Sequence, residues 1–193
     1  MHPLPDGRES NPECEYLWIS LYLYTLRCYK TLQVMASFKP TSLWEARPHT
    51  LAKIEIVRRY LYLWFSILGT NPDNKRLIYI DGFAGPGGYT NSAQSSPIAA
   101  LQAAKAAIEQ PGAKLNETEL SFLFVERQKE FADSLRDVAS ATPWPAQIKW
   151  HVEEGDFSEK VGQFLTELRQ QGQRLAPTFA FIDPCYGVVR QGE

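Results

Sequence analysis

Hydrophobic and polar residues fall into two kinds of segment that alternate along the chain. Short apolar runs, of the kind that form buried parallel strands, occupy residues 77–80, 120–125, 148–152 and 178–182. Apolar residues at three- and four-residue steps predict helices over residues 50–68, 96–108, 128–139 and 157–168. Regular alternation of strand and helix requires a parallel sheet with helices on both faces. We therefore expect an α/β fold of the Rossmann-like kind.

Capping residues indicate where the first two helices begin. Thr50 is the expected N-cap of the first helix, which should end at Gly69. Ser96 is the expected cap of the second helix, because Pro97 follows it and suits a first helical turn.

A glycine-rich loop follows the first strand, in the sequence Asp81-Gly-Phe-Ala-Gly-Pro-Gly-Gly88. Its glycines can adopt positive φ and let a ligand approach the backbone closely. Asp81 ends the strand, so it should lie at the carboxyl edge of the sheet, where open α/β folds bind ligands. A tight turn without any ligand would use the same residues. The loop alone therefore does not identify a site.

An acidic residue stands at or just beyond the end of each predicted strand: Asp81, Glu126, Asp156 and Asp183. Because parallel strands end at the same edge, these carboxylates should converge on one ligand site. The chain lacks the G-x-x-x-x-G-K-[ST] motif of P-loop nucleotide-binding proteins. A dinucleotide site would need its ribose-binding acid about 20 residues after the glycines. Glu126 lies about twice as far on, so NAD fits poorly.

S-adenosylmethionine is the cofactor with which the acids Asp81, Glu126 and Asp156 could each make a specific interaction. The Glu126 carboxylate can accept hydrogen bonds from both ribose hydroxyls, and Asp156 can accept one from the adenine amino group. The loop amides can bind the methionine carboxylate, while Asp81 suits the nearby ammonium and sulfonium groups. Methyl transfer then needs positioning of the two reactants and no attacking side chain. The expected cofactor-binding residues are Asp81, Gly82, Phe83, Ala84, Gly85, Gly87, Glu126 and Asp156.

The segment from Trp44 to Tyr186 resembles the three-Cys-motif partner (TcmP) family. The resemblance rests on His49-Thr50 with Lys53 and Tyr60-Leu61, Tyr79-Ile-Asp-Gly-Phe-Ala-Gly-Pro-Gly-Gly88, Ser96-Pro-Ile-Ala-Ala-Leu101, Phe124-Val-Glu126, Gly155-Asp156 and Phe181-Ile-Asp-Pro184. That family is similar to class I methyltransferases. The resemblance therefore implies a methyltransferase-like fold that binds S-adenosylmethionine.

The motif after the fourth strand resembles the Asp-Pro-Pro-Tyr of enzymes that methylate exocyclic amino groups of nucleic-acid bases. By this resemblance Asp183 and the Pro184 carbonyl would hold the target amino group, and Tyr186 would stack on a flipped base. The TcmP family usually reads Asp-Pro-Phe-Gly, whereas here Cys185 and Tyr186 precede the glycine. A turn that merely ends the strand is the structural alternative for Asp183-Pro184.

A class I methyltransferase sheet has seven strands in the order 3-2-1-4-5-7-6, whereas this sequence ends shortly after the fourth. We expect either a truncated product or a second chain that supplies the missing half. The resulting half-domain should bind the cofactor but turn over weakly or not at all. The alternative function is a non-catalytic partner protein that keeps the fold and assembles with a neighbouring gene product.

Composition narrows the remaining possibilities only slightly. The chain has 193 residues and a formal charge of −2, from 20 basic and 22 acidic residues, so charge does not point to nucleic acid or membrane. The local basic groups at 58–59, 75–76 and 127–129 are typical of solvated surface. Three widely spaced cysteines without ligand-spaced histidines predict reduced thiols in a cytoplasmic protein without a structural metal.

Residues 1–45 form a predicted N-terminal extension, followed by a cofactor-binding domain over residues 46–193. The extension contains an apolar run, 16–26, that is too short for the roughly 20 residues of a membrane span. It should pack on the domain as a short helix or strand. A second possibility is that translation naturally begins at Met35.

Overall fold

The computed structural model describes residues 45–91, 94–113, 115 and 117–183. The helices in this part of the chain are α2 (Pro48–Leu68), α3 (Ser96–Glu109), α4 (Lys129–Ser140) and α5 (Phe157–Gln170). The strands are β1 (Arg76–Asp81), β2 (Glu119–Glu126), β3 (Ile148–Glu154) and β4 (Thr178–Phe181). The predicted alternation of strands and helices is confirmed. Almost all of the predicted extension (1–44), and the motif residues Pro184, Cys185 and Tyr186, lie outside the described residues.

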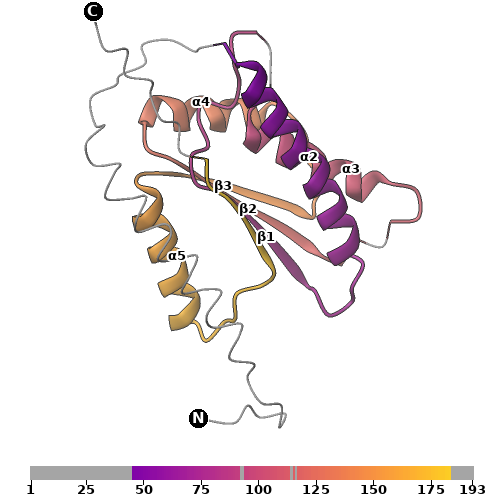
Figure 1. Ribbon diagram of the computed structural model, residues 1–193. Helices are drawn as coiled ribbons and strands as arrows, with labels where there is room; N and C mark the ends of the chain where they lie inside the picture. Colours follow the sequence, from indigo (N-terminus) through magenta and orange to yellow (C-terminus); the bar gives the residue numbers. More distant parts are fainter. Residues whose placement is uncertain (1–44, 92–93, 114, 116, 184–193) are drawn as a thin grey trace, which may run out of the picture. The chain divides into compact units, whose positions relative to one another are not determined.

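The four strands form a parallel sheet in the order β3-β2-β1-β4. Asp81 at the end of β1 is level with Phe124 of β2 on one side and with Phe181 of β4 on the other. The chain moves outward from β1 to β3 and then returns to the other side of β1 (Figure 1). Open α/β sheets generally bind ligands where the strand order reverses in this way, outside the carboxyl ends of the strands. Here that position lies beyond the ends of β1 and β4.

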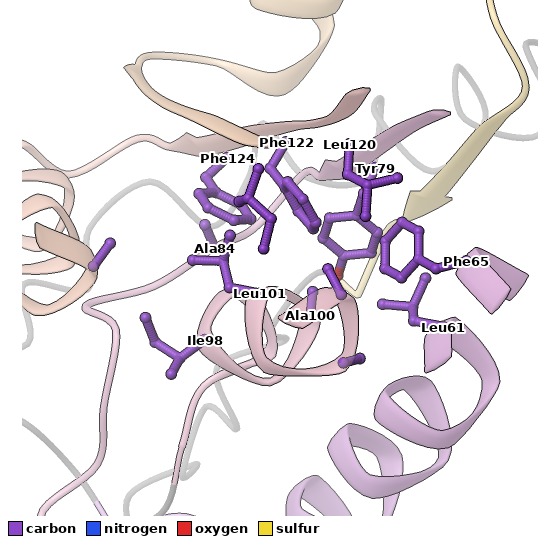
Figure 2. Packing of buried hydrophobic residues seen from close by; sticks show 14 of the residues in the cluster. Leu61, Phe65, Tyr79, Ala84, Ile98, Ala100, Leu101, Leu120, Phe122 and Phe124 are labelled. Atoms are coloured by element: carbon purple, nitrogen blue, oxygen red, sulfur yellow. The ribbon is translucent and has the colours of Figure 1, made fainter. Parts of the chain in front are cut away.

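The main hydrophobic core lies between the sheet and helices α2, α3 and α4. Alternate side chains along a strand point to opposite faces, and one set, which includes Tyr79, Phe122 and Phe124, packs with Leu61 and Phe65 of α2 (Figure 2). Figure 1 shows α5 on the opposite side of the sheet from α2 and α3. The described helices therefore cover both faces, as the α/β pattern requires.

Tyr79 is the largest fully buried side chain of this core. Its ring lies parallel to that of Phe179 in β4, with 6.0 Å between centroids, and 5.8 Å from the ring of Phe122 in β2. Aromatic pairs at such distances contribute about 0.5–1.5 kcal/mol each beyond the area they bury. Tyr79 thus joins three strands of the sheet, and its hydroxyl reaches the carboxylate of Asp81.

Helix α2 is amphipathic, but apolar residues also lie outside its buried face. Its buried residues are Ile54, Val57, Leu61 and Phe65, at helical spacing. Five large apolar side chains are exposed on the same helix: Leu51, Ile56, Tyr60, Leu63 and Ile67. None of the helices in the described ranges is both long and apolar enough to cross a membrane.

Both predicted N-caps are wrong: Thr50 lies three residues after the observed cap of α2, and Ser96 lies one residue after that of α3. Helix α2 begins at Pro48, with Arg47 as its N-cap, so Thr50 lies inside the first turn. Proline suits this position because its φ angle is already helical and its missing N–H would have no helical partner. Helix α3 begins at Ser96 with Ser95 as the N-cap. The predicted end of the first helix at Gly69 is confirmed, since Gly69 is the C-cap.

Two leucines on α2 provide a test of this packing. Leu61 is fully buried, whereas Leu63 is 56% exposed. We expect L61A to lower the free energy of unfolding by about 2–5 kcal/mol, because it removes buried methyl groups and leaves a cavity. The matched change L63A should alter it by no more than about 0.5 kcal/mol. Urea unfolding followed by circular dichroism measures both, and equal effects would contradict the assigned faces of α2.

Candidate functional site

The carboxylates predicted to form the site lie at one edge of the sheet. Asp81 ends β1 and Glu126 ends β2, while Asp156 and Asp183 each come two residues after the last residue of β3 and β4. Because all four strands are parallel, these positions share the carboxyl edge. The contacts of the four side chains differ greatly, and each is described in turn.

Glu126 bonds directly to the glycine-rich loop. Its Oε2 accepts a hydrogen bond of 2.8 Å from the Gly85 amide, and its Oε1 accepts one of the same length from the Gln128 amide. The second bond lies next to the start of α4, whose N-cap is Gln128. One partly buried carboxylate therefore joins the end of β2 to the loop that follows β1.

The glycine-rich loop is also held by α4 and by the end of β2. The Ala84 amide donates to the Val125 carbonyl at 3.0 Å, and the Ser134 hydroxyl donates to the Pro86 carbonyl at 2.8 Å. Gly87 has φ +90°, and a Cβ there would lie 3.2 Å from the Cα of Leu135. Only glycine therefore meets both the backbone conformation and the close approach to α4.

Asp156 caps α5. Its Oδ1 accepts hydrogen bonds from the Ser158 amide at 2.9 Å and from the Glu159 amide at 3.4 Å. This role was missed in the sequence, although Asp156-Phe-Ser-Glu159 has the acid-x-x-Glu spacing that marks helix starts. The cap fixes Asp156 at the carboxyl edge and gives it a structural role, whatever it binds.

Phe157 is a further residue at this edge that the sequence did not single out as part of the site. Its ring lies 6.0 Å from that of Phe83 in the loop, and a Cβ on Gly82 would come within 2.7 Å of it. Gly82 is therefore needed for the close approach of α5. Phe83 and Phe157 together give the acidic edge an aromatic surface, and the position of Phe157 directly after Asp156 was the available signal.

Asp81 is completely buried and its bonds go to protein groups. Its Oδ1 accepts from the Phe83 amide at 3.2 Å, and its Oδ2 accepts from the Tyr79 hydroxyl at 3.3 Å. The pKa of Asp81 is raised from 3.8 to about 6, and burial is the largest cause. The charge of Asp183 also raises this pKa, whereas hydrogen bonds from Ser96, the Phe83 amide and Tyr79 lower it. Burial and the Asp81 charge likewise raise the pKa of Tyr79 well above its usual value.

Asp183 pairs with a lysine from α2. The ammonium of Lys53 lies 2.8 Å from Oδ1 and 3.0 Å from Oδ2 of the carboxylate. Asp81 is level with Phe181, two residues before Asp183, and the Asp183 charge contributes to raising the pKa of Asp81. Pro184 and Tyr186, the other expected catalytic residues, lie outside the described residues.

Taken together, these groups suit a ligand that donates hydrogen bonds. The loop from Gly82 to Gly88 carries no lysine or arginine, so it offers amides but no cationic side chain to a phosphate. Carboxylates accept hydrogen bonds from hydroxyl and amino groups. Among the described residues, no three His, Cys, Asp or Glu side chains are grouped to hold a metal ion. The edge thus offers acceptors to a ligand that carries hydroxyl or amino groups.

The raised pKa of Asp81 predicts how stability depends on pH. The folded protein binds this proton more tightly than the unfolded chain does, so ionising Asp81 costs free energy as the pH rises from about 4 through about 6. The full cost corresponds to about 3 kcal/mol. We expect D81N, which keeps an acceptor oxygen but cannot ionise, to become more stable relative to wild type by about this amount between about pH 4 and pH 7.5.

Urea unfolding of both proteins across this pH range gives the difference directly, because the other titrating groups are common to both. A difference in unfolding free energy that stays constant, or that changes in the opposite direction, would show that the Asp81 carboxyl is not destabilised by burial.

Comparison with known proteins gives no further identification. No protein-family model matches this sequence, and a search of curated proteins finds no match.

Proposed function

We propose that this protein is a methyltransferase-like protein, similar to the TcmP family, that binds S-adenosylmethionine at the carboxyl edge of its sheet. The contact between the Glu126 carboxylate and the Gly85 amide carries the proposal. It brings the acid that ends β2 against the glycine-rich loop, so a ligand lying over that loop would meet a hydrogen-bond acceptor. This is the arrangement that a ribose bound beside a glycine loop needs.

The strand order supports this proposal. The order β3-β2-β1-β4 agrees with the first four strands of the methyltransferase order 3-2-1-4-5-7-6. Dinucleotide-binding folds share this part of the order, but they place the ribose-binding acid about 20 residues after their glycines. The distance from Gly85 to Glu126 favours S-adenosylmethionine.

Glu126 keeps acceptor capacity for the ribose hydroxyls. Each carboxylate oxygen has two lone pairs, and one amide bond to each leaves one further position on each. Asp156 would accept from the adenine amino group, and Phe83 with Phe157 would offer the ring an apolar surface. When bound, S-adenosylmethionine supplies an activated methyl group; the residues of the chain orient it and exclude water.

We infer that the acceptor is an exocyclic amino group of a nucleic-acid base. The inference rests on Asp183-Pro184-Cys185-Tyr186 and on the place of Asp183, just beyond β4 where the strand order reverses. A carboxylate there can accept a hydrogen bond from the amino group and hold it for transfer. Pro184 and Tyr186 would provide the carbonyl and the stacking ring. The three widely spaced cysteines of the sequence suit a cytoplasmic location, which is part of the same proposal.

A non-catalytic partner protein is the second candidate. The exposed apolar residues of α2, among them Ile56, Leu63 and Ile67, favour it, because exposed apolar surface often marks contact with another protein. In that case the chain would keep the fold and assemble with a second protein, for which a neighbouring gene product is the candidate.

Binding of S-adenosylhomocysteine, the product of methyl transfer, tests the first candidate. We expect wild-type protein to bind it in calorimetric titration and E126Q to bind it about 10–100-fold more weakly, since hydrogen bonds to a charged group contribute about 1.5–3 kcal/mol. The control is E119Q, which removes a carboxylate at the other end of β2, where Glu119 pairs with Arg76. E119Q should bind like wild type.

Circular dichroism shows whether each variant is folded. If folded wild-type protein does not bind S-adenosylhomocysteine, the cofactor proposal is wrong and the partner-protein candidate is favoured. Equal loss of affinity in E119Q would mean that Glu126 has no specific role.

Transfer of a labelled methyl group tests the acceptor. We expect slow incorporation into single-stranded oligo(dA) or oligo(dC), whose bases carry exocyclic amino groups, and none into oligo(dT), whose base has none. Incorporation should disappear in D183A, because the amino group would lose its acceptor. Labelling of oligo(dT) equal to that of the other two would rule out amino-group methylation.

A further inference from the structure

The contact between Lys53 and Asp183 joins two distant parts of the chain at the carboxyl edge. Lys53 lies in the second turn of α2, and Asp183 follows β4, 130 positions later. The lysine ammonium contacts both carboxylate oxygens, at 2.8 Å and 3.0 Å. Two turns further along α2, the ring of Tyr60 lies 5.2 Å from that of Phe179 in β4. These two contacts hold helix α2 beside β4, with Lys53 at the carboxyl edge of the sheet.

Stability does not explain this pair. The side chains of Lys53 and Asp183 are 51% and 36% exposed, and exposed pairs contribute little because solvent screens them and two side chains must be ordered. What the contact does determine is geometry. One ammonium bound to both oxygens fixes the direction in which the carboxylate points.

The Lys53–Asp183 pair also balances negative charge near the buried carboxyl of Asp81. Asp183 acts electrostatically on Asp81, which is buried and is otherwise contacted by Tyr79 from β1, Ser96 at the start of α3 and the Phe83 amide. Two neighbouring carboxylates repel each other. The Lys53 ammonium supplies the opposite charge in direct contact with Asp183.

We propose that Lys53 is the positioning residue of the acceptor site: it orients the Asp183 carboxylate and offsets its charge beside Asp81. This inference rests on the proposed function, in which Asp183 receives the amino group of the acceptor. A carboxylate has about four acceptor positions, so the Lys53 contact leaves room for that amino group. Helix α2 therefore takes part in setting the acceptor site.

The first test needs no enzymatic activity. Carboxyl NMR follows the titration of Asp81 in wild type, K53M, K53R and D183N. We expect K53M to raise the pKa of Asp81, with proton binding about threefold tighter, because the Asp183 charge is no longer offset. K53R should resemble wild type, and D183N should lower the pKa of Asp81, since it removes the charge. The matched control is K75M, which breaks the exposed Lys75–Glu117 pair near the opposite edge and should change nothing.

The second test measures methyl transfer to the oligonucleotide that wild-type protein methylates. K53M should lower the rate at least about tenfold, K53R should restore most of it, and K75M should match wild type. Affinity for S-adenosylhomocysteine should be unchanged in all three variants, because Lys53 contacts the acceptor side and not the residues around Glu126.

Two results would overturn the proposal. An unchanged Asp81 titration in K53M would mean that Lys53 does not offset the Asp183 charge. Faster methyl transfer by K53M would mean that Lys53 competes with the acceptor for the carboxylate. If wild-type protein fails to bind S-adenosylhomocysteine, the proposed function is lost, whereas the NMR titration still decides whether Lys53 controls the charge around Asp183.

Discussion

The bond from the Gly85 amide to the Glu126 carboxylate is the contact on which the carboxyl edge depends. It ties the loop after β1 to the end of β2, and the second oxygen of the same carboxylate binds the Gln128 amide at the start of α4. Gly85 and Gly87 adopt positive φ. Because glycine can adopt many other backbone conformations, the loop needs contacts that hold it in this one. A single side chain thereby fixes the ends of two strands and the start of a helix.

The four acids at the carboxyl edge are each held by different groups. Asp81 is buried and its pKa is raised. Glu126 receives two backbone amides, and Asp156 caps α5, where the helix dipole favours a negative charge. Asp183 has the Lys53 ammonium. Each acid therefore has its own surroundings, and only Asp183 among the four is paired with a cationic side chain in the described residues.

The residues at the carboxyl edge fall into two adjacent groups. Glu126, the loop amides and the Phe83–Phe157 pair lie toward β2 and β3, whereas Asp183 and Lys53 lie at β4 and α2. Asp81, at the end of the central strand, lies between them. In the proposed function the first region holds the methyl donor and the second holds the acceptor. The exposed apolar face of α2 adds a surface that either candidate function can use for a partner.

The sequence by itself determined the elements of the fold and the edge on which the acids lie. Strands 77–80 and 120–125 could be recognised because a buried parallel strand must be apolar along its whole length, and the shared edge follows from strand direction alone. The start of α2 was misassigned to Thr50, because local capping preference outweighed the signal of Pro48. Only the tertiary structure decided that Glu126 bonds to Gly85 and that Lys53 faces Asp183. Sequence patterns report periodicity within one element, whereas these contacts join residues 41 and 130 positions apart and depend on how strands and helices pack.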